Sequence, residues 1–254
     1  MSEARLQGKV CIITGTGGTM GRAAALLFAS EGARVVGCDL SEERALDTLQ
    51  QVRAAGGVME SLSPCDLTDA RECKALVAFA IERFGAIDVL YNNAAMAYFS
   101  WIEEMSETDW KNTLNEELNL VFLLTQAAWP HLKASQGAIV NTASSVARLA
   151  FKHLPAIAHS TAKAGIIAMT RHMAMEGAPH KIRANSISPG SVVSNQSKVQ
   201  LADKTWADYL TSRIMLGRPA DPREIATAAL FLASSDSSYV TGADLAVDGG
   251  MTAW

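Results

Sequence analysis

Four residues that can bind or transfer a proton lie within one short stretch of this 254-residue chain. Ser144 and Ser145 come first, His159 follows them by 15 and 14 residues, and Lys163 follows His159 by four. A free imidazole titrates at about pH 6.5, so at neutral pH a histidine is mostly a base that can take the proton of an alcohol. The stretch therefore predicts a centre of acid–base chemistry.

The elements expected to position this centre alternate between short β-branched runs and amphipathic helical stretches. A helix is expected from Arg22 to Glu31, and Ser41 is a suitable N-cap for another. Strict alternation favours a Rossmann-like α/β fold, a doubly wound parallel sheet with helices on both faces, and one domain over residues 1–254. Seven strands are expected, at Val10–Ile13, Arg34–Cys38, Val58–Leu62, Ile87–Tyr91, Ala138–Thr142, Arg183–Ile187 and Asp244–Val247.

Residues 194–215 interrupt the alternation after the sixth strand. The segment is polar but contains Trp206 and Tyr209. Insertions after the carboxyl end of a strand often form a substrate lid, so we expect one here. The alternative is a helical excursion that only packs on the surface.

Composition excludes several classes of function. The net charge of −4 leaves no basic footprint for nucleic acid, and no apolar run reaches the roughly 18 residues of a membrane span. The N-terminus lacks the apolar core of a signal peptide. The four cysteines and the remaining histidines have no metal-ligand spacing, so we expect no metal and a cytoplasmic protein with reduced thiols.

A glycine cluster marks a binding site for a dinucleotide. Residues Thr14–Gly21 follow the first strand and lead into the first helix, which is the context that such a turn requires. Glycines let the backbone approach a pyrophosphate, and the helix N-terminus offers free N–H groups. Asp39 ends the second strand, where a carboxylate accepts hydrogen bonds from ribose hydroxyls and repels a 2′-phosphate. NAD is therefore favoured over NADP.

The order of these motifs resembles the short-chain dehydrogenase/reductase (SDR) family over nearly the whole chain. Asp66 is similar to its adenine-contacting aspartate, residues 92–95 to its Asn-Asn-Ala-Gly motif with Ala95 for glycine, and residues 189–194 to its Pro-Gly motif. Members that prefer NADP often carry Lys or Arg where Gly18 and Leu40 stand. The resemblance implies an NAD site formed by Gly15, Gly17, Gly18, Thr19, Met20, Gly21, Asp39, Leu40, Asp66, Leu67, Asn93, Ala94, Lys163, Pro189, Gly190 and Val192.

Thr19 departs from the family's phosphate-binding turn, because it replaces the middle glycine. Either Gly18 supplies the missing backbone freedom, or the Thr19 hydroxyl donates to a phosphate oxygen. We expect NAD to bind in both cases.

The proton-transfer residues depart further from the family. Its Asn, Ser, Tyr and Lys become Glu117, Ser145, His159 and Lys163, with Ser144 as the alternate serine. The resemblance implies that serine binds the substrate oxygen, that lysine holds the ribose, and that His159 replaces tyrosine as the acid/base. Glu117, if it is near, could offset the lysine charge. Asn115 and Asn119 should face other sides of their helix.

The expected activity is hydride transfer between NAD(H) and a secondary alcohol or ketone. Three alternatives remain: non-redox chemistry such as that of a lyase, dehydratase or dehalogenase; an enzyme impaired by a lost or deliberately replaced tyrosine; or a nucleotide-binding scaffold. An apolar or cyclic small-molecule substrate is expected at Tyr98, Trp101 and Trp206, with Phe99 and Arg148 as further candidates. By analogy with the family, the chain should form a homotetramer or homodimer.

Overall fold

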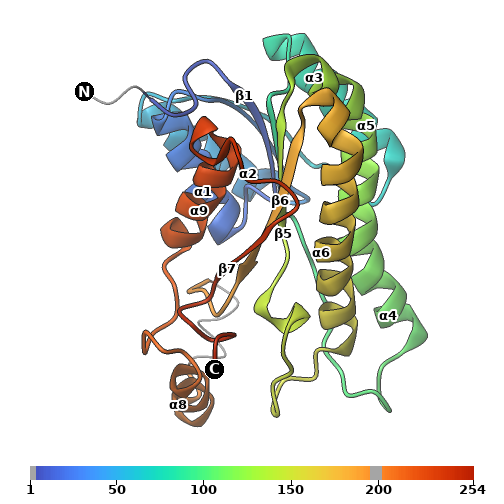
Figure 1. Ribbon diagram of the computed structural model, residues 1–254, viewed down its shortest axis with the longest axis vertical. Coiled ribbons are helices and arrows are strands. Elements are labelled where there is room, and N and C mark those ends of the chain that lie inside the picture. Colours follow the sequence, from blue (N-terminus) through green and yellow to red (C-terminus); the bar gives the residue numbers. More distant parts are fainter. Residues whose placement is uncertain (1–3, 195–201) are drawn as a thin grey trace.

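A computed structural model of the chain, which describes residues 4–194 and 202–254, contains a seven-stranded parallel sheet (Figure 1). The strand order is β3-β2-β1-β4-β5-β6-β7. The chain therefore runs outward in one direction to β3 and then crosses back to β4 beside β1. This confirms the predicted doubly wound sheet. The strands are β1 (Val10–Thr14), β2 (Arg34–Cys38), β3 (Val58–Leu62), β4 (Val89–Asn92), β5 (Ala138–Thr142), β6 (Arg183–Pro189) and β7 (Asp244–Val247).

Helices cover both faces of this sheet. In Figure 1 one layer holds α1, α2 and α9, and the other holds α3, α4, α5 and α6. Short 3-10 turns occupy Ser145–Ala147, Ala178–His180 and Ser235–Ser237. The helices are α1 (Thr19–Ser30), α2 (Glu42–Ala54), α3 (Ala70–Phe84), α4 (Glu107–Leu114), α5 (Leu120–Ser135), α6 (Ile157–Gly177), α8 (Lys204–Ser212) and α9 (Pro222–Ala233), with a π-helix at Asn115–Asn119 between α4 and α5.

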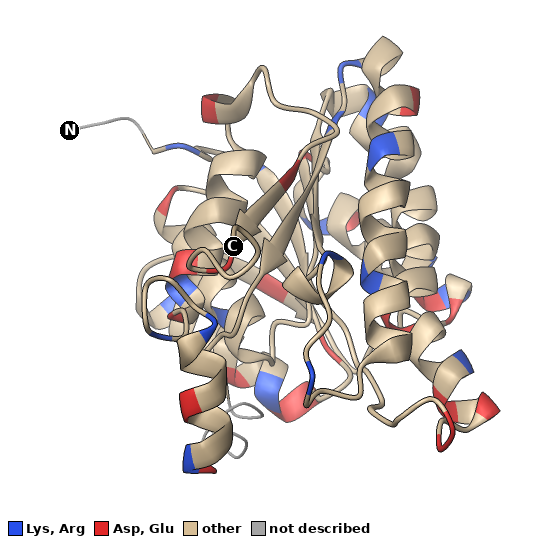
Figure 2. Ribbon diagram, turned by 60° about the horizontal axis from the view of Figure 1, so that its bottom comes forward, with Lys and Arg blue, Asp and Glu red and all other residues tan. Residues whose placement is uncertain are grey.

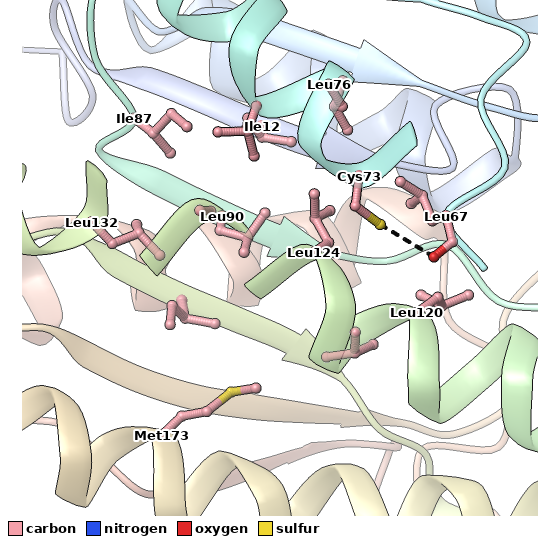
Figure 3. Packing of buried hydrophobic residues seen from close by; sticks show 14 of the residues in the cluster. Ile12, Leu67, Cys73, Leu76, Ile87, Leu90, Leu120, Leu124, Leu132 and Met173 are labelled. Carbon is pink, nitrogen blue, oxygen red and sulfur yellow. Dashed lines mark hydrogen bonds between the residues drawn. The ribbon is translucent and has the colours of Figure 1, made fainter. Parts of the chain in front are cut away.

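Two apolar cores hold the layers together, one on each face of the sheet. Alternate residues of a strand point to opposite faces, so Ile12 of β1 packs toward α3 and α5 while Ile13 packs toward α1 and α9. Figure 3 shows the first core, where Leu90 and Leu124 are fully buried. At roughly 25 cal/mol per Å² of apolar surface, this burial is the main stabilising contribution.

Three predicted boundaries were wrong by two or three residues, and the ends of β1, α1 and β4 differ by one residue. The first helix begins at Thr19, not at Arg22, because Gly18 N–H bonds to the Gly15 carbonyl and closes the turn early. The fourth strand begins at Val89 because the Asp88 carboxylate binds Lys9 and the Val10 amide just before the sheet. The sixth strand continues beyond Ile187 to Pro189 because β7 pairs with its last residues.

The predicted lid lies partly outside the described residues. Of residues 194–215, the part from 202 onward contains α8, which begins at its N-cap Asp203. Leu210 and Ile214 pack with Met251 in a small third core, and Leu149, Phe151 and Trp206 cover it. The described part of the segment is therefore docked on the loop that follows β5.

The surface carries both signs of charge in similar numbers. Figure 2 shows Lys and Arg interspersed with Asp and Glu along the helices, as 22 basic and 26 acidic residues predict. Among the described residues, no helix is both long enough and apolar enough to cross a membrane.

Four free cysteines are buried in the sheet region: Cys11, Cys38, Cys65 and Cys73. The Cys73 thiol lies between α3 and the core and points to the Leu67 carbonyl (Figure 3). Burial raises the pKa of Cys73 to about 12. A hydrogen bond with the Cys65 thiol, together with burial, raises the pKa of Cys38. These thiols are core residues of low reactivity.

Candidate functional site

The predicted site residues meet at the carboxyl ends of the strands, which face the bottom of Figure 1. β1 lies between β2 and β4; the chain leaves β1 toward β2 and leaves β4 toward β5, in opposite directions across the sheet. In open parallel sheets, ligands bind at such a reversal of strand order.

The glycine turn after β1 is shaped by close backbone approaches. Gly15 has φ +70° and bonds through its N–H to the Cys38 carbonyl at 2.8 Å. A Cβ on Gly21 would lie 2.1 Å from the Gly15 carbonyl oxygen, so only glycine fits there. A Cβ on Gly17 would lie 2.9 Å from the Asp39 carboxyl carbon. The sequence thus has glycine where the backbone leaves no room for a side chain.

The N-terminus of α1 is open to an anion. Gly18 is its N-cap and supplies no side-chain hydrogen bond. No described residue accepts a hydrogen bond from the backbone N–H groups of Thr19, Met20 or Gly21. Three free donors at a positive dipole end suit a pyrophosphate. Thr19 is the first helical residue and needs no positive φ, so a threonine fits the turn without strain.

Asp39 is held rigidly after β2. Its carboxylate accepts from Gly17 N–H at 2.9 Å and from Ser41 N–H at 2.8 Å. The Arg44 guanidinium lies 3.8 Å from the same carboxylate, a contact that the sequence motifs did not reveal. Leu40 is exposed. The carboxylate thus faces the glycine turn with a cation beside it.

The Asn-Asn-Ala-Ala segment is tied directly to β1. The Thr14 hydroxyl accepts from the Asn93 and Ala94 amides at 2.9 and 2.8 Å, and Asn93 Nδ2 donates to the Thr14 carbonyl at 2.9 Å. Asn93 Oδ1 is buried and has no partner among the described residues. An orphaned buried acceptor beside a glycine turn fits a bound donor group.

Asp66 and Leu67 follow β3 with different roles for their side chains. The Asp66 carboxylate accepts from the Thr68 amide and hydroxyl at 2.9 and 2.7 Å, which fixes its direction. The Leu67 side chain is buried in the core under α3 (Figure 3). Only the backbone of Leu67 could therefore meet a nucleotide.

The Pro189-Gly190 segment lies against the loop after β7. Gly190 N–H bonds to the Val247 carbonyl at 3.1 Å, and a Cβ on Gly190 would lie 2.9 Å from Asp248 Cα. Val192 pairs with Ala220 in an isolated bridge. This segment follows the carboxyl end of β6, at the same edge of the sheet as the glycine turn after β1.

Glu117 connects the two basic residues of the predicted proton-transfer set. Its Oε2 lies 2.7 Å from His159 Nδ1, and its Oε1 lies 3.4 Å from Lys163 Nζ. Lys163 also donates to the Thr142 carbonyl at 3.2 Å. Glu117 is only 2% exposed, and His159 is 17% exposed through its side chain. The structure therefore brings these three residues together.

A π-helix turns Glu117 inward. Residues Asn115–Asn119 form one wide turn between α4 and α5, and Asn119 Nδ2 donates to Asn115 Oδ1 at 2.6 Å across it. Glu117 is buried, whereas Asn115 and Asn119 are exposed. Those two asparagines face away from the site, as expected. Single π-turns within helices often occur at functional sites.

The two serines have distinct environments. The Ser144 hydroxyl accepts from Val146 N–H at 3.4 Å and caps the short turn after β5. Ser145 is 3% exposed, and its hydroxyl makes no hydrogen bond with any described residue. Ser145 is thus the serine whose hydroxyl is free for a ligand.

The aromatic residues predicted for the substrate do not form one cluster. Tyr98 lies against Glu116, whose carboxylate raises the pKa of the phenol. Trp101 is half exposed. Trp206 packs on Tyr209 with ring centroids 5.6 Å apart, and Tyr209 meets His153. Phe99 contacts His159 instead, at 5.5 Å between centroids.

The parallel bridge between Ser100 and Ala156 explains the Phe99 contact. It holds the segment after β4 against the start of α6, so the Phe99 ring covers His159. The sequence marked Phe99 only as one of several aromatics. Arg148 is not available for a substrate carboxylate, because it binds Asp244 at 2.6 Å.

Comparison with known proteins decides the family. The family model described as enoyl-(acyl carrier protein) reductase matches residues 15–252. A 3-oxoacyl-(acyl-carrier-protein) reductase of Thermotoga maritima is 40% identical over 250 residues, which cover 97% of this chain and 99% of that protein. The chain belongs to the SDR family. It is therefore an oxidoreductase of the nicotinamide-dependent type.

Other SDR relatives are named for different activities. A trans-4-hydroxycyclohexanecarboxylate dehydrogenase of Sinomonas cyclohexanicum is 36% identical over 254 residues, 98% of this chain and 95% of that protein. The crystal structure of an Agrobacterium tumefaciens protein, described as a 2-deoxy-D-gluconate 3-dehydrogenase, contains bound NADP. It has a TM-score of 0.90 and 31% identity, with 100% of both chains covered.

Proposed function

We propose that this SDR transfers a hydride between NAD(H) and a secondary alcohol or ketone, with His159 as the acid/base. The observation that carries the proposal is the environment of His159. Its Nδ1 faces Glu117, while Nε2 makes no hydrogen bond with any described residue, and the ring is partly exposed. One ring nitrogen is thus held and the other is available. A general base must present such a free nitrogen to its substrate.

The described residues fit a nicotinamide dinucleotide. The open N-terminus of α1 suits the pyrophosphate, Asp39 suits the adenosine ribose, and Asn93 Oδ1 is an unpaired acceptor nearby. Asp66, Lys163 and Val192 would complete the site as the family resemblance implies. When bound, the nicotinamide accepts or supplies the hydride.

The chain's own residues handle the proton. In the oxidation direction, the alcohol O–H bond breaks, its proton passes to the lone pair of His159 Nε2, and the C–H bond releases its electron pair as the hydride. The carbonyl forms as both leave. Ser145 donates to the substrate oxygen and orients it. Reduction reverses each step, and the imidazolium then returns its proton to the oxygen.

The substrate is expected to be apolar or cyclic. Phe99 lies against His159, and Met96, Trp101 and Ile102 of the same segment after β4 are exposed apolar side chains. Arg148 is engaged by Asp244, so it does not await a carboxylate. The cyclohexane-based substrate in the name of one relative agrees with this class. In the described part of the predicted lid, Trp206 on α8 would border the substrate.

NAD is the expected cofactor. The rigid Asp39 carboxylate would repel a 2′-phosphate, and Arg44, the cation beside it, is already held by that carboxylate. The relative with bound NADP makes this the sharpest point to test. We expect kcat/KM with NAD to exceed that with NADP by at least about tenfold, which is about 1.4 kcal/mol.

We further propose one domain, a cytoplasmic location and a homotetramer or homodimer. Phe122 on α5, Met175 on α6 and Tyr239 before β7 are large exposed apolar or aromatic side chains. Covering such residues is what an oligomer interface does. Sedimentation as a monomer at micromolar concentration would refute the assembly.

A panel of cyclic and open-chain secondary alcohols tests the activity. NADH absorbance at pH 7 to 9 should rise with at least one cyclic alcohol and fall in reverse with its ketone. Substrate turnover without any change in NADH would instead indicate lyase-type chemistry. If no panel member reacts while His159→Tyr creates activity, the impaired-enzyme interpretation replaces the proposal.

A further inference from the structure

We propose that Glu117 is a positioning residue that fixes the tautomer of His159, and that Lys163 balances the negative charge of Glu117. Nδ1 then carries the proton, and Nε2 is the atom that exchanges one with the substrate oxygen. This inference rests on the proposed function for its kinetic consequence, but the tautomer itself exists without any substrate. It explains two departures from the family, at positions 117 and 159, as one hydrogen-bonded pair.

The first step is the contact between the carboxylate and the ring. The 2.7 Å distance from Glu117 Oε2 to His159 Nδ1 lies in the range of a charge-assisted hydrogen bond. An ionised carboxylate only accepts hydrogen bonds. The hydrogen must therefore be on Nδ1. A free imidazole in water has no such constraint, so Glu117 determines which nitrogen is the base.

The second step is charge balance. Glu117 is almost fully buried, and a buried carboxylate needs a cation or several donors. Its other oxygen lies 3.4 Å from Lys163 Nζ, which also donates to the Thr142 carbonyl. The ammonium compensates the carboxylate, so the imidazole can be neutral in the resting state. The ring is then free to gain and lose one proton.

The third step is the direction of the free nitrogen. The Phe99 ring lies 5.5 Å from the imidazole at 56°, and the His159 side chain retains 17% of its exposure. No described residue hydrogen-bonds Nε2. With Nδ1 occupied and one side of the ring covered, Nε2 is the remaining polar atom that a substrate can reach.

The fourth step explains why the two positions depend on each other. A tyrosine at position 159 has one O–H donor and no second donor for a carboxylate. Glu117 would then interact with Lys163 alone. Conversely, an asparagine at position 117 has no formal charge, so it cannot fix the tautomer of His159 as a carboxylate does. The histidine and the glutamate should therefore be coupled, beyond the sum of their separate effects.

Glu117→Gln is the decisive variant. Lys163 is a donor only, so the amide that replaces the carboxylate turns its oxygen toward Nζ and its NH₂ toward His159. Nδ1 must then accept, and the proton moves to Nε2. Nitrogen NMR of His159, without substrate or cofactor, should show the Nδ1–H form in the parent and the Nε2–H form in the variant.

Kinetics supplies the second measurement. For alcohol oxidation, Glu117→Gln should lower kcat by about 100-fold or more while KM for NAD changes by less than about threefold. Glu116→Gln is the matched control, because that carboxylate is on the same turn but contacts Tyr98 instead of His159. It should leave the tautomer unchanged and kcat within about twofold.

A double-mutant cycle protects the test against misfolding of a single variant. In the chain that keeps His159, Glu117→Asn should lower kcat by about 50-fold or more. In the His159→Tyr background, the same change should lower kcat by about threefold or less. Equal costs in both backgrounds, or an unchanged tautomer in Glu117→Gln, overturn the inference. If the tautomer inverts as expected in an enzyme without redox turnover, the positioning role stands and the proposed function fails.

Discussion

The proposed cofactor edge and the proposed proton-transfer site both lie at the carboxyl end of the sheet, but different parts of the chain form them. At the cofactor edge the contacts are made mostly by backbone groups. Gly15, Gly17 and Gly21 allow close approach, and the N–H groups in the first turn of α1 have no acceptor among the described residues. At the proton-transfer site three side chains from two helical segments meet, and Glu117 contacts both of the others.

The difference indicates how each region tolerates change. A backbone site depends on local turns, so most side chains around it can vary while the nucleotide still binds. A side-chain site depends on every member, because removing one leaves a buried partner without compensation. We therefore expect the cofactor turn to tolerate changes in the side chains around it, and positions 117 and 159 to depend on each other. The following experiments test that contrast.

The largest effect is expected at His159. Replacing it with alanine removes the acid/base, which should lower kcat by about 10²- to 10⁴-fold. The NAD dissociation constant should change by less than about twofold, because the side-chain contacts of His159 within the described residues are with Glu117 and Phe99 and not with the glycine turn. Stopped-flow absorbance and calorimetric titration measure the two quantities. An equal loss of turnover and NAD affinity would show that the two regions are not separable.

Lys163→Met should cause the largest loss of stability. It leaves the Glu117 carboxylate buried without its cation, which costs about 3–5 kcal/mol of unfolding free energy. Urea denaturation followed by circular dichroism measures the change. Combining it with Glu117→Leu should restore at least about 2 kcal/mol, because an apolar pair replaces the buried ion pair. If the double variant is no more stable than the single one, the ion pair is not the cause.

Gly21→Ala tests the backbone region. The new methyl would lie 2.1 Å from the Gly15 carbonyl oxygen, so the turn must open. We expect a loss of about 1–3 kcal/mol and at least tenfold weaker NAD binding, measured by thermal unfolding and calorimetry. Gly18→Ala is the control, since its methyl would lie 3.3 Å from the same oxygen. Comparable losses in both variants would contradict the steric explanation.

The smallest expected effect concerns the choice of cofactor. Asp39→Ala removes the repelling carboxylate and frees Arg44 for a 2′-phosphate. The ratio of kcat/KM for NAD over NADP should fall about tenfold or more, equal to about 1.4 kcal/mol. Adding Arg44→Ala should reverse most of that shift. A ratio that is insensitive to both changes would place cofactor discrimination elsewhere.

Local sequence patterns predicted most of the fold. The strands Arg34–Cys38, Val58–Leu62, Ala138–Thr142 and Asp244–Val247 have the predicted bounds, because short apolar and β-branched runs between helical stretches are a local signal. The glycine turn was also recognisable, since its glycines are required by backbone contacts within a short segment. The helix start at Thr19 was missed because Gly15 and Gly18 close the turn three residues early.

The arrangement of the site was less predictable because it depends on distant contacts. Glu117 could be assigned by motif order, but nothing in its spacing reveals the π-helix that turns it inward. Phe99 reaches His159 through a bridge between Ser100 and Ala156, more than fifty residues apart in the sequence. Such contacts arise from tertiary packing, which periodicity along one segment does not contain.

The buried cysteines also provide a kinetic measurement. Cys38 and Cys65 directly precede Asp39 and Asp66, and both thiols are shielded in the folded chain. An alkylating reagent can modify them only after this edge of the sheet opens, so the rate of labelling measures the frequency of that opening. A bound dinucleotide should slow their labelling in proportion to its saturation. The labelling rate of these two thiols therefore reports how often the cofactor edge opens.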